Sequence, residues 1–551
     1  MARTLILFSF VIILVVGCGP SDLDVAIQQI TADELRKHIA ELASDRMEGR
    51  APATRGDSLA TEYIVAQYKA IGLEPAGENG TYLQKVPIIG TKLLPGSSIQ
   101  IKHGGRTIPL HVSNEAVIMS GYHQTNVTLK ESDLIFVGYG IDAPEQNWDD
   151  YKGVDVKGKV LLMLNNDPPS DDPKFFGGKA RTYYGRWTYK YEIAAKKGAA
   201  GAIIIHTNES AGYPYQVVQN SWGRERFDLD AEDPAGRIVL KGWTTEEATK
   251  KYLTMAGFDL AKLIKDAGSR DFKPVPLRLK VSASMKFTVR RLTTNNIIGK
   301  LTGSDSALSK QYVIFSAHYD HLGIGKPVNG DSINNGALDN ASGTSMMLTL
   351  AKAFATMTTK PKRSLLFVAV AAEEYGLLGS QFYAQNPTVP VASMAANMNI
   401  DGINIWGKTN DITFLGWDRS SLGAEVDAVA REMKMVVKPD AYPEQGYFYR
   451  SDHFNFAKVG VPVLYLDTGT DFIGKPGSFA KEMVDLYNEK HYHQPSDELR
   501  DDWNFEGAIQ QAEFVLRVVK RIADNPAMPT WNKGDEFEAA RLRVLAEAKK
   551  E

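Results

Sequence analysis

The sequence predicts an α/β protein with a mixed, largely parallel central sheet sandwiched by helices, into which a mainly β domain is inserted. Beyond Asn296, short continuous apolar runs alternate with helical patterns, as expected for strands that are covered on both faces. Between about Val117 and Val281, short β-branched runs alternate with turns rich in Gly, Pro and Asp. With 551 residues and 43% hydrophobic content, the chain is long enough for two or three domains.

The first residues resemble a secretory signal. Arg3 is followed by an apolar run over residues 5–16, which is shorter than a membrane-spanning helix needs. The run ends in Gly17 and Cys18, a stretch that resembles a bacterial lipobox, and Cys18 is the only cysteine. We therefore expect no intrachain disulfide, export across the inner membrane, and a membrane anchor through lipidation at Cys18. Gly19 favours the outer membrane, facing the periplasm or the cell surface.

Two helices are predicted in the N-terminal region. Thr31 and Glu34 read as a capping box, and apolar spacing continues the first helix through Leu42. The second runs from about Asp57 to Ile71 and stops at Gly72.

The region beyond Asn296 supplies the strands of the predicted sheet. They are Tyr312–Ser316, Ser364–Ala371, Met394–Ile400 and Val461–Leu466, and the helices between and after them are Thr344–Met357, Ser420–Met433 and Phe505–Ile522. The net charge of -3 gives no basic surface of the kind that binds polyanions, so we expect no nucleic-acid partner.

Ionisable side chains follow the ends of these strands, where an open α/β sheet gathers its functional groups. They are His318, Asp320 and His321 after the first strand, Glu373 and Glu374 after the second, and Asp401 after the third. Asp339 lies in a glycine-flanked turn before a helix, and His491 and His493 lie in a late loop. Histidine and carboxylate suit zinc, and two histidines with three acids furnish two metal sites if one acid bridges.

The ordered set of His-x-Asp, Asp-Asn, Glu-Glu, Asp and late His resembles metallopeptidase family 28, the co-catalytic zinc aminopeptidases, from about Asn295 to Ile522. The resemblance implies a zinc exopeptidase fold and two zinc ions per chain. It also implies that His318 and Asp401 hold one zinc, that Glu374 and His493 hold the other, and that Asp339 bridges them.

The same resemblance implies that Glu373 is the general base and that Asp320 accepts a hydrogen bond from the second ring nitrogen of His318. His493 is preferred to His491 because the residues after it resemble the family's loop, and His321 has no assigned role, although it could replace His318.

Residues 151–160 and 195–203 resemble a protease-associated domain. The expected organisation is a lipoprotein signal peptide (1–17), a linker (18–28), the N-terminal part of the catalytic domain (29–116), the inserted protease-associated domain (117–285), the zinc peptidase domain (286–525) and a charged tail (526–551).

The expected function is that of a metallopeptidase acting on peptides, and the leading interpretation is an aminopeptidase that uses metal-activated water. The alternatives are a carboxypeptidase or dipeptidase on the same dinuclear site, a glutaminyl cyclase, and a non-catalytic binding protein. The sequence shows neither a Gly-x-Ser-x-Gly elbow nor a His-Glu-x-x-His helix. The oligomeric state is left open.

Overall fold

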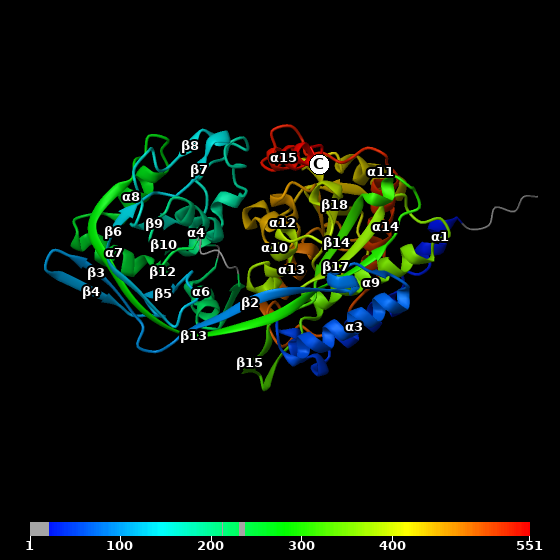
Figure 1. Cartoon of the computed structure of the whole chain (residues 1–551), viewed down its shortest axis with the longest axis horizontal. Helices are drawn as coiled ribbons and strands as arrows, with labels where there is room; N and C mark the ends of the chain where they lie inside the picture. Colours follow the sequence, from blue (N-terminus) through cyan, green and yellow to red (C-terminus); the bar gives the residue numbers. More distant parts are fainter. Residues whose placement is uncertain (1–20, 212, 231–236, 551) are drawn as a thin grey trace, which may run out of the picture.

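The computed structural model describes residues 21–211, 213–230 and 237–550. Cys18 and the signal peptide 1–17 lie outside the described residues, so lipidation and export stay predictions. None of the helices in the described ranges is both long and apolar enough to cross a membrane. Figure 1 shows two lobes side by side, joined by one long strand.

The larger lobe is built on a mixed sheet whose central strands are parallel. In spatial order its strands are β11 (Arg226–Leu229), β2 (Leu83–Leu93), β13 (Val275–Leu301), β17 (Ser364–Val370), β14 (Tyr312–His318), β18 (Met394–Ile400), β21 (Val463–Asp467), β19 (Asp411–Leu415) and β20 (Val436–Lys438). The short β1 (Glu74–Pro75) pairs with the end of β13. Strands β17, β14, β18 and β21 run parallel, and each corresponds to a predicted apolar run.

Successive residues of the central strands enter two different cores. Val313 and Phe315 of β14 pack into one hydrophobic cluster, whereas Ile314 packs into the other. One face is covered by α9 (Ser342–Thr356), α14 (Glu506–Asp524), α3 (Arg55–Ile71), α2 (Ala32–Leu42) and α1 (Asp22–Ile27), and the other by α10 (Leu378–Gln385) and α12 (His453–Lys458). The predicted α/β sandwich is therefore confirmed.

The predicted helix ends coincide with local stop and start signals. Thr31 caps α2 by accepting a hydrogen bond from the Glu34 N–H at 3.2 Å. Helix α3 begins two residues before the predicted start and ends at Gly72, whose φ of 86° lies in the left-handed region that favours glycine.

The smaller lobe has its own sheet and its own core. The sheet order is β4 (Arg106–Leu110), β3 (Ser98–His103), β13, β6 (Asn126–Phe136), β9 (Val160–Leu164), β10 (Gly201–His206), β12 (Leu240–Thr245) and β5 (Ala116–Met119). Besides these strands it carries α4 (Trp187–Lys196), α6 (Tyr215–Trp222), α7 (Glu246–Met255) and α8 (Leu260–Ala267). Its core extends from Ile99 to Phe287, so β3 and β4 pack with this lobe rather than with the N-terminal region. Its likeness to a protease-associated domain stays a prediction.

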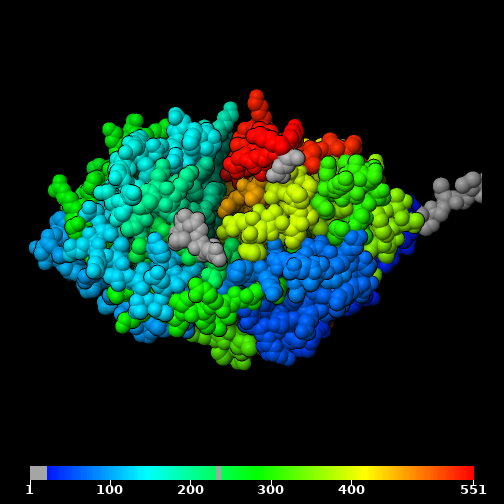
Figure 2. Space-filling model, viewed as in Figure 1, coloured from blue at the N-terminus to red at the C-terminus, as the bar shows by residue number. Residues whose placement is uncertain are grey.

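Strand β13 belongs to both sheets. Its first half pairs with β3 and β6 in the smaller lobe, and its second half pairs with β2 and β17 in the larger lobe. The lobes are thus joined through a hydrogen-bonded strand and not through a flexible linker. Figure 2 shows their surfaces lying against each other.

The C-terminal segment also packs onto the larger lobe. The Trp531 indole donates to the Gly460 carbonyl at 2.9 Å. In α15 (Glu538–Glu547), the guanidinium of buried Arg541 donates to the Met394 carbonyl at 2.9 Å. The remaining helices of the described chain are α5 (Asn208–Ala211), α11 (Gly423–Met433) and α13 (Phe479–Lys490).

Candidate metal centre

The sheet register brings the predicted residues to one edge. His318 is the last residue of β14 and lies opposite Val370 at the end of β17, so Glu373 and Glu374 follow close to it. Strand β18, on the other side of β14, ends at Ile400 and leads directly into Asp401. Because these strands are parallel, their carboxyl ends open on the same edge.

Asp339 lies between two histidines. The Nε2 atom of His318 is 3.2 Å from Asp339 Oδ1 and 3.2 Å from Asp401 Oδ1. On the other side, His493 Nε2 is 3.2 Å from Asp339 Oδ2 and 3.0 Å from Glu374 Oε2. The structure thus brings all five predicted ligands together, with one oxygen of Asp339 facing each group. Their roles as ligands stay a prediction.

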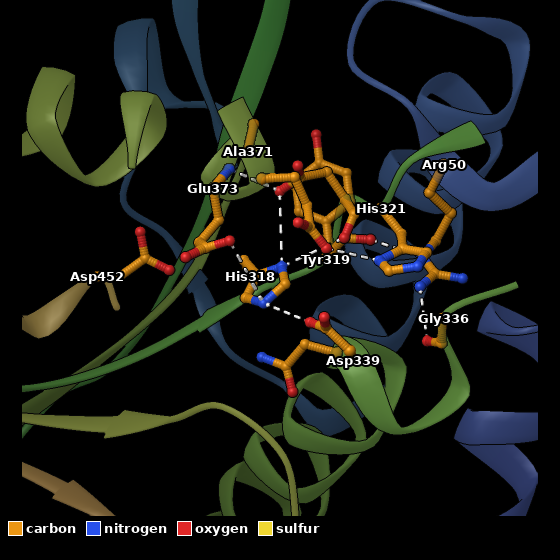
Figure 3. Close-up of polar contacts among 12 residues, drawn as sticks. Arg50, His318, Tyr319, His321, Gly336, Asp339, Ala371, Glu373 and Asp452 are labelled. Carbon is orange, nitrogen blue, oxygen red and sulfur yellow. Dashed lines mark hydrogen bonds and ion pairs between the residues drawn. The ribbon is translucent and has the colours of Figure 1, made fainter. Parts of the chain in front are cut away.

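Glu373 points at this cluster without being bound in it. Its Oε2 atom is 4.0 Å from His318 Nε2, and no hydrogen bond engages its carboxylate among the described residues (Figure 3). Burial raises the pKa of Glu373 well above its ordinary value, His318 opposes the shift, and the nearby Glu374 adds to it. Glu373 is therefore an uncommitted carboxyl group at the centre of the site.

The buried charges of the cluster favour the binding of a cation. Although burial opposes the charged form, hydrogen bonds from His318 and His493 hold the pKa of Asp339 well below its ordinary value. Burial likewise opposes charge on His318, but Asp401 and Glu373 raise its pKa well above the ordinary value. Converging, buried carboxylates with imidazoles are the oxygen and nitrogen donors that zinc prefers, so the residues present fit zinc ions.

Asp497 holds the turn that carries Asp339. Its carboxylate accepts hydrogen bonds from the Leu338 N–H at 3.0 Å and the Asp339 N–H at 3.1 Å, and its carbonyl accepts from the Ala337 N–H at 2.9 Å. Sequence reasoning gave Asp497 no role, although it belongs to the late loop whose pattern identified His493. The Ser451 hydroxyl donates to Asp401 Oδ2 at 2.6 Å, a contact that sequence reasoning did not specify.

The contacts of Asp320 differ from the expectation. His318 Nδ1 donates to the Asp320 backbone carbonyl at 3.2 Å, whereas the Asp320 carboxylate is 3.8 Å away. That carboxylate instead accepts the Glu373 N–H at 3.0 Å. Burial raises the pKa of Asp320 to about 8. Asp320 thus orients His318 through its main chain and Glu373 through its side chain.

Arg50, from the N-terminal region, is fully buried beside the cluster (Figure 3). Its guanidinium donates to the carbonyls of Tyr319 at 2.6 Å, Asn335 at 2.7 Å and Gly336 at 2.9 Å, and also to that of Leu42. It therefore ties the segment after His318 to the turn before Asp339.

Arg50→Met is expected to lower the free energy of unfolding by on the order of 3 kcal/mol, because buried carbonyl acceptors lose their donor. Urea denaturation measures the change. The matched control is Arg46→Met, which removes a half-exposed side chain paired with Glu41 and is expected to change stability by less than about 1 kcal/mol. Equal stabilities of the two variants would show that the Arg50 bonds are dispensable.

The cluster opens into a pocket of about 260 Å³. Glu373, Asp401, Arg450, Asp467 and Tyr492 are among the residues that line it. The smaller lobe reaches its rim, since the Arg181 N–H donates to the Pro443 carbonyl at 3.0 Å and the Tyr183 ring packs against Phe454. A concave site with converging polar groups is typical of a substrate pocket.

Comparison with known proteins agrees with this geometry. Residues 296–517 match the model of peptidase family M28. A probable zinc metalloprotease from Pyrenophora teres f. teres (strain 0-1) is 36% identical over 254 residues, covering 42% of this chain and 50% of that protein. A glutamate carboxypeptidase 2 homolog from Caenorhabditis elegans is 24% identical over 301 residues, covering 46% and 35%.

A solved structure shares the fold of most of the chain. The aminopeptidase from Aneurinibacillus sp. strain AM-1 superposes with a TM-score of 0.52 at 18% identity, covering 92% of this chain and 97% of that one. The chain spans only about half the length of the curated zinc metalloproteases that it matches. All five predicted ligands lie within the matched residues 296–517, whereas Arg50 lies outside them.

Proposed function

We propose that the chain is a zinc-dependent exopeptidase that holds two metal ions and releases N-terminal residues from peptides. The observation that carries the proposal is Asp339, which presents one carboxylate oxygen to His318 and the other to His493, both at 3.2 Å. An acid shared in this way suits two neighbouring cations. The M28 match and the zinc metalloprotease relative support zinc as the metal.

The proposed chemistry assigns a separate task to each side chain. When bound, the cations supply a Lewis acid and lower the pKa of a water molecule. The Glu373 carboxylate, which has no hydrogen-bonding partner among the described residues, would accept a proton from that water and deliver it to the departing amine. Asp320 fixes the Glu373 main chain, and Ser451 fixes Asp401, so the groups keep their relative positions.

The pocket offers groups for either end of a peptide. Asp467 lines it, and its carboxylate accepts a hydrogen bond from the Thr468 N–H at 2.7 Å. Such an acid suits a free amine and favours the aminopeptidase. Arg450 also lines the pocket; its guanidinium lies 5.1 Å from the Tyr447 ring centre and has no carboxylate partner among the described residues. Arg450 favours a substrate carboxylate and keeps a carboxypeptidase or dipeptidase as the second candidate.

The test uses protein that starts at Ser21 and one tripeptide in free, N-acetylated and C-amidated forms. We expect hydrolysis of the free and amidated peptides and loss of at least about 100-fold in kcat/KM on acetylation, because the amine anchor is gone. Chelation should abolish turnover, and added zinc should restore it. Loss on amidation instead of acetylation would assign the carboxypeptidase, and chelator-resistant hydrolysis would refute the metal mechanism.

A further inference from the structure

His321 contacts the cluster although the proposed chemistry gives it no task. The residue is 0% exposed, and its Nδ1 atom lies 2.6 Å from Glu374 Oε1. The other oxygen of Glu374, Oε2, lies 3.0 Å from His493 Nε2. His321 and His493 thus approach opposite oxygens of one carboxylate.

The contact assigns the proton of the ring. A carboxylate oxygen accepts, so Nδ1 donates and Nε2 is left as an acceptor. Nε2 is buried and has no hydrogen-bond partner among the described residues. A histidine that ligates a metal almost always donates its other ring N–H to a partner. Ligation through Nδ1 would put the proton on Nε2, which has no such partner, so the geometry favours a hydrogen bond from Nδ1 to Glu374 over ligation through Nδ1, even though ligand atoms of His321, Asp339 and Glu374 lie within 4.8 Å of one another.

The surroundings fix the imidazole in place. A Cβ atom at Gly336 would lie 2.5 Å from His321 Cγ, so only glycine allows the ring to pack here. The Arg50 guanidinium donates to the Gly336 carbonyl at 2.9 Å, and the Arg50 backbone carbonyl accepts a hydrogen bond from the backbone N–H of His321 at 3.4 Å. The ring of His493 lies edge-on to His321, with centroids 5.7 Å apart. The Nδ1–H is thereby aimed at Glu374 before any ligand arrives.

We propose that His321 is a positioning residue for one of the two metal positions. By donating to Glu374 Oε1, it turns Oε2 toward His493 and Asp339, and so prepares three ligands for one cation. The proposal rests on the proposed function. It makes the two positions unequal, since among the described residues His321 contacts Glu374 but neither His318 nor Asp401.

The experiment is zinc titration of the purified full chain, followed as bound zinc per chain. His321→Leu removes the donor, whereas His321→Asn keeps an amide N–H near the place of Nδ1. We expect His321→Leu to weaken one of two bound zinc ions by about 10–100-fold, with the other unchanged, and His321→Asn to recover most of that loss. His206→Asn, at a buried histidine of the smaller lobe, is the matched control and should bind like the wild type.

The outcomes separate the two proposals. Wild-type protein that binds no zinc would refute the proposed function itself. Two zinc ions bound equally well by the wild type and His321→Leu would overturn the role of His321 alone. Equal losses in His321→Leu and His321→Asn would make His321 a ligand and also overturn it. Thermal unfolding without zinc checks folding, and His321→Ala replaces the leucine variant if that variant does not fold.

Discussion

Glu373→Gln lowers kcat by about 10²–10⁴-fold while two zinc ions stay bound, if Glu373 is the group that moves the proton. The amide has the shape of the carboxyl group but cannot accept a proton at neutral pH. Within the described part of the chain, the Glu373 carboxylate makes no hydrogen bond, so its replacement removes no support from the ligands. Steady-state kinetics and elemental analysis of the same sample measure the two effects.

The control for this variant is Glu62→Gln, an exposed glutamate on α3. It should match the wild type in kcat and in zinc content. Retention of most activity by Glu373→Gln would assign the proton transfer to another group. Loss of zinc together with activity would instead make Glu373 a ligand.

Asp339→Asn is expected to remove both zinc ions and to lower kcat/KM by at least about 10³-fold. A neutral amide would replace the carboxylate charge that faces both His318 and His493, so several kcal/mol of electrostatic stabilisation would be lost. Asp339 is the only acid of the set that contacts both His318 and His493 among the described residues. Elemental analysis after dialysis measures the metal content.

The matched control is Asp331→Asn in the strand β16 (Asp331–Asn334), which pairs with β15 (Gly323–Val328) outside the cluster. It should retain zinc and activity. An Asp339→Asn variant that keeps one zinc with full affinity would show that the two positions do not share this acid, and would contradict the bridging role.

The parts of the fold set by local patterns could be predicted from the sequence. The run Met394–Ile400 is β18 without any shift, because its residues are buried as expected for a strand covered on both faces, and its two asparagines donate hydrogen bonds to Ser316 and Ser451. Gly72 marks the end of α3 because its backbone is left-handed. The helices of the smaller lobe, such as α4, were not predicted, since its short β-branched runs dominated the local pattern.

Pairing between distant segments could not be read from the chain. Apolar residues alternate from Leu277 to Phe287 along β13, but nothing in the local pattern indicates that this strand continues into a second sheet. The approach of His318, Glu374 and Asp401 to one another could be predicted, because these residues follow parallel strands whose carboxyl ends lie at the same edge of the sheet. Arg50 could not, because its role depends on carbonyls that are about 270–285 residues away in sequence.

The pairing of β2 with β13 has a consequence for the origin of the smaller lobe. Chain enters that lobe after Leu93 and returns at Phe287, and these two residues face each other in an antiparallel ladder. Topologically, the smaller lobe therefore occupies the place of the turn in a β-hairpin, and the segment between these residues also contributes the edge strand β11, which pairs with β2. An ancestor with a simple turn between β2 and β13 could acquire such a segment, or lose it, without re-threading the parallel strands β17, β14, β18 and β21.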